Sequence, residues 1–135
     1  MNEEVWKLSQ HRLQRAERAL EEGRSLLAKG FFEGAVNRFY YAAFYAAKAL
    51  LATKDLDSSK HSGMISLFHE HFVKTNLFDK EKAKALSRSF EERQDTDYED
   101  FVSITEQEVE DLQRQVEAFL KECQKVLASL PKREK

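Results

Sequence analysis

The chain has 135 residues, the size of one domain with a single core, and its one Pro and four Gly favour helices. Its 41% hydrophobic and 34% charged residues exclude a disordered chain, and a net charge of −2 argues against a general binder of the nucleic-acid backbone. A single Cys excludes a disulfide framework, and the lack of a secretory signal or a membrane-spanning apolar run predicts a cytoplasmic protein.

Five helical segments are predicted: about 3–28, 32–53, 60–75, 80–92, and one ending near 129 after a capping box of Ser103 with Glu106 or Thr105 with Glu108. Gly30 can end the first segment, Asn76 can end the third, and Asp79 can cap the fourth. The second segment is apolar on most sides, which predicts the central, most buried helix. The predicted fold is one all-α domain over residues 1–135. It is an up-and-down bundle of four main helices plus one shorter helix, with the third and fourth segments across one side.

One face of the second segment carries cations and rings, whereas its other faces are apolar. Arg38, Tyr41, Tyr45 and Lys48 recur there at helical spacing, while Tyr40 falls on an adjoining stripe that is predicted to be core. The face fits a partly exposed edge, where Tyr and Lys cover apolar surface and keep their polar ends in water. It fits equally well a self-association or ligand-binding face, because Tyr and Arg anchor interfaces.

The His residues do not have the spacing of a metal site. His69 and His71 are two residues apart, so on a helix they point in different directions and are expected to lie on a solvated surface. His61 begins the third segment, in line with its apolar face. It fits a half-buried His satisfied by a backbone or Tyr partner, or a site group that faces Arg93. We expect no metal and no cofactor.

The segment RQDTDYEDF, residues 93–101, follows the fourth helix without a Gly or Pro. Arg93 continues the apolar spacing of that helix, so one further turn would point it inward, where a charge needs a partner. Asp97 is the obvious partner, and Tyr98 adds a ring and a hydroxyl. The plainer hypothesis is that an ion pair of Arg93 and Asp97 acts as a staple, holding this corner of the bundle together. Tyr98 would then pack over the pair as a lid. The functional hypothesis is that the planar guanidinium holds a phosphate or an RNA backbone.

Three pieces of the sequence resemble a known family in order and spacing: NRFYYAAFYAAKALL (37–51), KHSGMISLFHEHFVKTNLF (60–78) and RSFEERQDTDYEDF (88–101). With the long amphipathic last segment, they resemble the HEPN domain, in particular its small stand-alone bacterial and archaeal members. The resemblance covers nearly the whole chain. It implies a helical bundle that usually forms a homodimer and that is often encoded beside a minimal nucleotidyltransferase, as a toxin–antitoxin-like pair.

The resemblance also implies a site. Active HEPN toxins are metal-independent ribonucleases in which an Arg is followed after four to six residues by a His, and two copies meet at the dimer interface. Arg93 matches that Arg and Gln94 the polar residue after it, but Tyr98 stands at the earliest His position and no His follows. A Tyr titrates at about pH 10 and is a poor substitute for a group that exchanges protons near neutral pH. In some pairs the partner adds AMP to a Tyr just after the motif, which makes Tyr98 a candidate modification site.

Three hypotheses follow. The leading one is a non-catalytic or weakly active module that pairs with a minimal nucleotidyltransferase and binds RNA or nucleotide through Arg93, Gln94, Asp97 and Tyr98. The second is a metal-independent endoribonuclease in which Arg93 acts with Tyr98, or with His61 brought in from the third segment. The third is a purely structural dimer. We expect the dimer face around Arg38, Tyr41, Tyr45 and residues 93–98.

Overall fold

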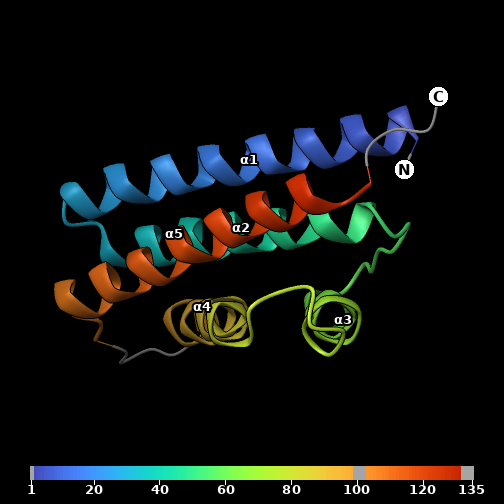
Figure 1. Cartoon of the computed structure of the whole chain (residues 1–135). Helices are drawn as coiled ribbons and strands as arrows, with labels where there is room; N and C mark the ends of the chain where they lie inside the picture. The colour runs from blue at the N-terminus through green and yellow to red at the C-terminus, as the bar shows by residue number, and fades with distance from the viewer. Residues whose placement is uncertain (1, 99–102, 132–135) are drawn as a thin grey trace.

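The computed structural model describes residues 2–98 and 103–131, which form helices without any strand. The elements are α1 (Glu3–Ala28), α2 (Phe32–Ala52), α3 (His61–Phe68), the π-helical turn η1 (His69–Val73), α4 (Lys80–Tyr98) and α5 (Glu106–Ser129). Helices α1, α2 and α5 run side by side, each in contact with the other two, and α3 and α4 pass across one side of this group (Figure 1). The predicted all-α helical bundle is confirmed.

Helix α2 is the centre of this arrangement, as its composition predicts. It contacts α1, α3, α4 and α5, and its apolar stripe of Phe39, Ala43, Ala46 and Leu50 has no exposed surface. Helix α1 packs tightly on it at Gly23, where a methyl group would lie 2.5 Å from the Phe39 ring. The absence of a side chain at Gly23 therefore lets α1 and α2 pack closely. Helix α2 also contacts α3 and α4.

The helix ends follow the predicted signals. Gly30 ends α1 with φ 81°, and Asn76 also takes a left-handed conformation, with φ 62°, after η1. The side chain of Asp79 accepts a hydrogen bond from the Lys82 backbone N–H at 3.0 Å, which caps α4. Of the two expected capping boxes, the one that forms before α5 joins Thr105 and Glu108.

Helix α4 is longer than predicted, because it continues to Tyr98 instead of ending near residue 92. The segment from Arg93 to Tyr98 is thus helix and not a loop. Its polar residues contain no Gly or Pro that would stop the helix, and the ion pair of Arg93 with Asp97, four residues apart, supports its last turns. Residues 99–101 of the predicted joining segment lie outside the described residues.

The third predicted segment is also different, since regular α-helix ends at Phe68 and the π-helical turn η1 follows. The Lys74 backbone N–H bonds to the His69 carbonyl, five residues back. A wider turn of this kind holds one extra residue. It places Phe72 and Val73, which are neighbours in the chain, together in the core.

Candidate anion-binding site between α2, α3 and α4

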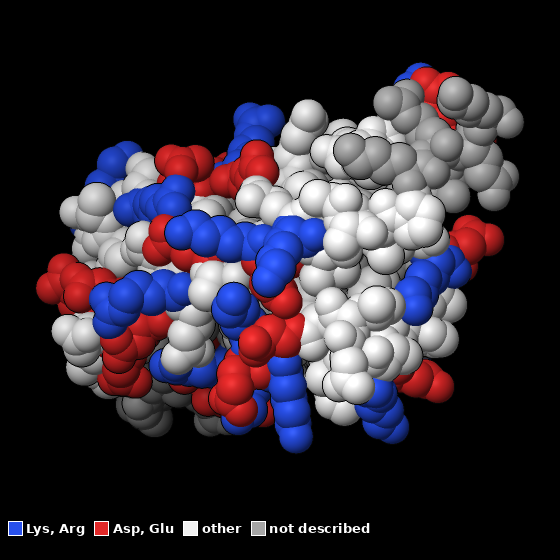
Figure 2. Space-filling model, viewed as in Figure 1, with Lys and Arg blue, Asp and Glu red and all other residues white. Residues whose placement is uncertain are grey.

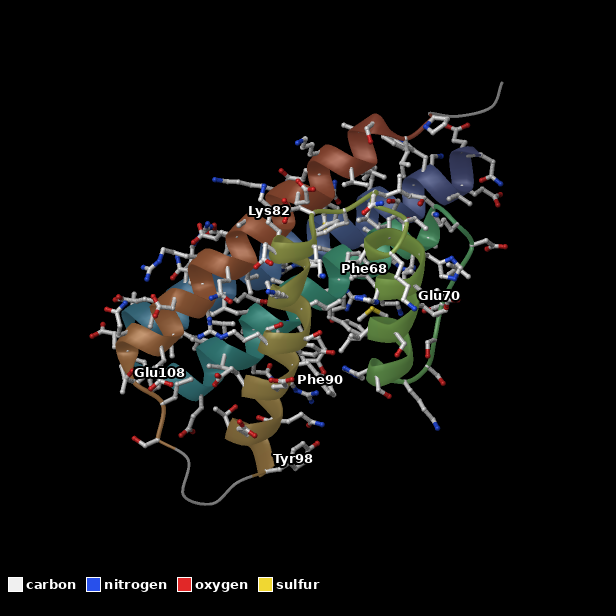
Figure 3. The ribbon with its side chains drawn as sticks, turned by 60° about the horizontal axis from the view of Figure 1, so that its bottom comes forward. Phe68, Glu70, Lys82, Phe90, Tyr98 and Glu108 are labelled. Carbon is white, nitrogen blue, oxygen red and sulfur yellow. The ribbon has the colours of Figure 1, made fainter. Side chains whose placement is uncertain are left out.

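Cations and aromatic rings from three helices meet where the second half of α4 passes the start of α3. Phe90 lies on the side of α4 that faces α3, and its ring centroid is 6.3 Å from that of His61 (Figure 3). Five of these residues form what we call the Arg93 cluster: Arg38, Tyr40, Tyr41, His61 and Arg93. The first three come from α2, His61 from α3 and Arg93 from α4.

Arg93 points inward, as its helical spacing predicts, and its side chain is 17% exposed. Its Cζ atom lies 5.4 Å from the ring centroids of both Tyr40 and Tyr41, which is within the range of cation–π attraction. Its Nε lies 3.1 Å from Asp97 Oδ2, yet this buried N–H has no partner in hydrogen-bond geometry. The two facts are compatible, because the carboxylate offers charge without lying in line with the N–H. Arg93 is therefore neutralised in part and retains a free donor.

The pair with Asp97 does not have the role expected for a staple. Both residues belong to α4, so their ion pair supports one helix and does not tie it to another. Tyr98 is 72% exposed at the end of α4, so the predicted lid is wrong (Figure 3). Gln94 is half-buried beside Arg93 in sequence.

Arg38 repeats the situation of Arg93 on the neighbouring helix. Its Cζ atom lies 5.3 Å from the Tyr41 ring centroid, and its Nε is 3.5 Å from Glu22 Oε1. This Nε is likewise buried without a hydrogen-bond partner. Arg38 Nε and Arg93 Nε are the two such side-chain atoms among the described residues. Two guanidinium groups that each have an unpaired N–H thus lie near the same aromatic ring. Such an arrangement of positive charge and free donors suits the binding of an anion.

His61 is held beside this pair by Tyr40. Its Nδ1 lies 2.5 Å from the Tyr40 hydroxyl, and its ring stacks on Phe44 with 4.6 Å between centroids. Burial lowers the pKa of His61, and the positive charges of Arg93 and Lys48 lower it further. Burial also raises the pKa of Tyr40 well above its ordinary value. At neutral pH, His61 is therefore an uncharged imidazole next to an uncharged phenol.

Tyr40 belongs to the Arg93 cluster, although its helical spacing predicts a core residue. The core assignment is correct, since Tyr40 has no exposed surface. However, it is a hydroxyl in an otherwise apolar stripe, and a buried hydroxyl needs a partner. This requirement is the one feature of the sequence that could have indicated a polar contact of Tyr40. The partner, His61, is 21 positions away in the sequence.

The rest of the predicted polar face of α2 makes bonds within the molecule. Tyr45 accepts a hydrogen bond from Arg15 at 2.9 Å and lies under that guanidinium, and Lys48 pairs with Asp57 at 3.2 Å. Only the part of the face nearer the start of α2, with Arg38 and Tyr41, joins the cluster. Any role of this face in dimerisation stays a prediction.

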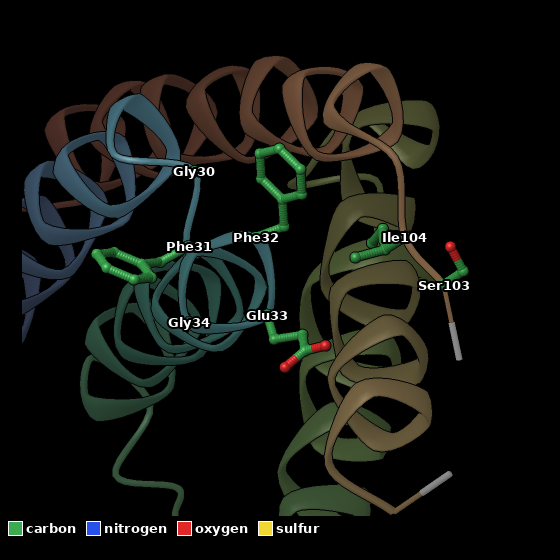
Figure 4. A pocket seen from close by; sticks show the side chains of 7 residues that line it. All are labelled: Gly30, Phe31, Phe32, Glu33, Gly34, Ser103 and Ile104. Carbon is green, nitrogen blue, oxygen red and sulfur yellow. The ribbon is translucent and has the colours of Figure 1, made fainter. Parts of the chain in front are cut away.

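The remaining surface offers weaker candidates. On the face shown in Figure 2, Lys and Arg intermingle with Asp and Glu, and one side is formed mainly by uncharged residues. A hollow of about 400 Å³ opens between the start of α2 and the segment before α5, and the described residues lining it include Glu33 and no cation (Figure 4). Over residues 2–98 and 103–131, no group of three or more His, Cys, Asp or Glu is placed to hold a metal ion. None of the described helices is long and apolar enough to cross a membrane.

Comparison with known proteins places the chain in a family. The HEPN domain family matches residues 9–126. The chain belongs to the HEPN family. Its relatives include a UPF0332 protein of Thermotoga maritima, 40% identical over 130 residues that cover 96% of this chain and 98% of the relative.

Two archaeal relatives of this HEPN protein carry a functional name. Both come from Methanocaldococcus jannaschii. "Putative toxin MJ0142" is 37% identical over 117 residues, covering 87% of this chain and 80% of the relative. "Putative toxin MJ0605" is 31% identical over 130 residues, covering 96% of both chains.

Proposed function

We propose that this HEPN protein is a non-catalytic or weakly active module that binds the phosphate groups of RNA or of a nucleotide at the Arg93 cluster. The observation that carries the proposal is a pair of buried Nε–H groups without hydrogen-bond partners, one from Arg38 on α2 and one from Arg93 on α4. Both guanidinium groups lie near the Tyr41 ring. A buried donor without a partner is costly, so a ligand that supplies acceptors is stabilised there. Phosphate oxygens supply both the acceptors and the opposite charge.

The aromatic rings of the cluster suit the rest of such a ligand. Tyr41 is only partly buried, and bases stack on aromatic side chains without regard to the nucleic-acid sequence. With a net charge of −2, the protein has no general field for a long nucleic acid. A short single-stranded or mononucleotide ligand therefore fits the cluster better than a duplex.

Titration calorimetry with 5′-AMP and with a short single-stranded RNA tests the binding. Arg93→Met keeps an unbranched apolar side chain and removes the charge, and we expect it to weaken binding roughly 10- to 100-fold, the equivalent of one charged hydrogen bond. Arg18→Met is the matched control, since it removes the same charge from an exposed position of α1. Equal losses of affinity in the two variants would mean that binding depends only on the overall charge of the protein and not on this site. A wild-type protein that binds neither ligand would contradict the proposal.

The proposal includes a partner and a dimer. Relatives named as toxins support a role in a toxin–antitoxin-like pair, and the exposed Tyr98 at the end of α4 is accessible to a modifying nucleotidyltransferase. Co-purification with a minimal nucleotidyltransferase, if one is encoded in the neighbouring reading frame, tests the pair. Mass spectrometry of the mixture with ATP tests AMP transfer, with Tyr98→Phe as the control. Sedimentation tests the dimer, and we expect Arg93→Glu to weaken it if two clusters meet at the interface.

A second candidate is a metal-independent endoribonuclease that uses Arg93 with His61. The observation in its favour is that α3 brings His61 to the Arg93 cluster, whereas Tyr98 is 72% exposed at the end of α4. Cleavage of RNA in the presence of EDTA tests it. Activity that survives Arg93→Ala would exclude this site. A protein that neither binds nor cleaves, yet stays dimeric, would be the purely structural dimer.

A further inference from the structure

The contact between Tyr40 and His61 determines which nitrogen of the imidazole carries the proton. The Tyr40 hydroxyl has one hydrogen, no exposed surface, and no hydrogen-bond partner except His61 among the described residues. If His61 donated from Nδ1, the phenol hydrogen would be buried without an acceptor, which is costly. The favourable arrangement has Tyr40 donating to an unprotonated Nδ1. In an uncharged imidazole, the proton then lies on Nε2.

The second nitrogen is open to a ligand. Nε2 of His61 has no hydrogen-bond partner within the described part of the chain, and it is not among the buried unbonded atoms, so water reaches it. Stacking on Phe44 and the short bond to Tyr40 fix the plane of the ring. A fixed, accessible N–H beside Arg93 is therefore a directed donor.

We propose that His61 is a phosphate-binding residue of the Arg93 cluster, that it donates from Nε2 to a phosphate oxygen, and that Tyr40 is the positioning residue that fixes this tautomer. The inference rests on the proposed function and adds to it the group that stands in for the His missing after Arg93. Arg38 and Arg93 supply the charge, and His61 supplies an additional, uncharged donor from a different helix.

The tautomer also separates the two candidate functions. A neutral imidazole that already has a proton on Nε2 cannot accept one there from a ribose 2′-hydroxyl, and its Nδ1 is occupied by Tyr40. The lowered pKa of His61, caused by burial and then by Arg93 and Lys48, keeps the doubly protonated form scarce at neutral pH. His61 is thereby suited to hold a phosphate and poorly suited to start its cleavage.

Nitrogen NMR of the imidazole tests the tautomer without any ligand. In wild-type protein labelled with ¹⁵N at His, we expect Nδ1 of His61 to resonate as an acceptor and Nε2 as a protonated nitrogen at pH 7. Tyr40→Phe removes the hydroxyl and keeps the ring, and we expect the two signals to move toward a mixture of tautomers. A proton found on Nδ1 in the wild type would overturn the inference.

Binding of 5′-AMP and of inorganic phosphate then tests the role. We expect His61→Ala to lose roughly 10-fold in affinity and Tyr40→Phe roughly two- to tenfold. His61→Gln and His61→Asn form a matched pair, because the amide nitrogen of Gln reaches the position of Nε2 and that of Asn reaches the position of Nδ1. Binding should be retained better by His61→Gln than by His61→Asn, with both folded by circular dichroism.

The outcomes separate this inference from the function on which it rests. If Arg93→Met abolishes binding while all His61 and Tyr40 variants bind as the wild type does, the proposed function survives and the role of His61 is refuted. If the wild type binds neither AMP nor phosphate, both fail. If His61→Asn and His61→Gln bind equally well, donation from Nε2 is excluded.

Discussion

A charged side chain lies near the core at each end of α4. The two side chains differ in whether their hydrogen-bonding groups have partners. At the first end, the side chain of Glu122 from α5 is 8% exposed, accepts the Asp79 backbone N–H at 3.1 Å and pairs with Lys82 at 3.7 Å. At the other end, Arg93 is 17% exposed and its Nε–H has no hydrogen-bond partner.

The difference teaches how to tell a structural charge from a site. Glu122 is bonded to the segment that it holds, so its burial is explained by the fold alone. The burial of Arg93 is only partly explained by the fold, because Asp97 supplies charge without an aligned acceptor. Where the fold leaves a buried charged group without a full set of hydrogen bonds, a ligand can supply the missing bonds.

The largest expected effect is on binding at the Arg93 end. Arg93→Met should weaken binding of 5′-AMP roughly 10- to 100-fold while the free energy of unfolding changes by less than about 1 kcal/mol, because an incompletely bonded charge is replaced by an apolar chain of similar size. Calorimetric titration and urea denaturation check the two parts. A large loss of stability with unchanged binding would make Arg93 a structural residue like Glu122.

The Glu122 end should give the opposite pattern. Glu122→Ala leaves the Asp79 backbone N–H without its acceptor, and we expect it to lower the free energy of unfolding by about 1–3 kcal/mol with unchanged AMP affinity. Urea denaturation measures the loss. Glu122→Gln keeps an acceptor oxygen and should cost less than Glu122→Ala. Equal costs would mean that this bond is not what stabilises the end of the helix.

Removal of the acidic neighbour of Arg93 should sharpen the contrast. Asp97→Asn keeps the shape of the side chain and removes the charge that competes with a phosphate. Since such partly exposed pairs contribute about 0.2–1 kcal/mol, we expect up to about fivefold tighter AMP binding and a similarly small loss of stability. Calorimetry at low salt measures the gain. Weaker binding in Asp97→Asn would show that Asp97 positions Arg93 for its ligand.

The Arg93 end should also carry a pH dependence through His61. Its pKa in the folded protein lies below the ordinary value of 6.5, because burial and then Arg93 and Lys48 disfavour the charged ring. As the pH falls below 6.5, the unfolded chain takes up a proton at His61 before the folded protein does, so the free energy of unfolding decreases over that window. His61→Gln should flatten this part of the profile, measured by urea denaturation between pH 7.5 and about pH 5. An unchanged profile would mean that His61 titrates normally in the folded state.

The smallest expected effect is at Tyr98. The residue is 72% exposed beyond the cluster, so Tyr98→Phe should change stability by less than about 0.5 kcal/mol and leave AMP affinity unchanged. The same two measurements check it. A marked loss of affinity would bring Tyr98 into the site, as the motif position suggests.

Much of the fold follows from local signals in the sequence. Gly30, Asn76, Asp79 and Thr105 mark helix ends because each acts through its own backbone or an adjacent turn. The end of α4 was missed because residues 93–98 are polar and contain neither Gly nor Pro. Only the surrounding structure determines whether such a segment stays helical.

The site was predictable in part. Helical spacing correctly turns Arg93 inward. The bond between Tyr40 and His61 joins two helices, and the sharing of the Tyr41 ring by Arg38 and Arg93 depends on how α4 crosses α2. Distances between helices are set by packing and not by periodicity, so these contacts could not be read from the sequence.

The most direct test of the central claim observes the Arg93 Nε–H itself. In ¹H–¹⁵N spectra of the wild-type protein, we predict that 5′-AMP shifts the Nε–H signals of Arg93 and Arg38 saturably and with one affinity, while signals around Glu122 stay in place. Nε–H signals that do not respond to AMP, or that move only together with those of exposed Arg residues such as Arg18, would contradict the account.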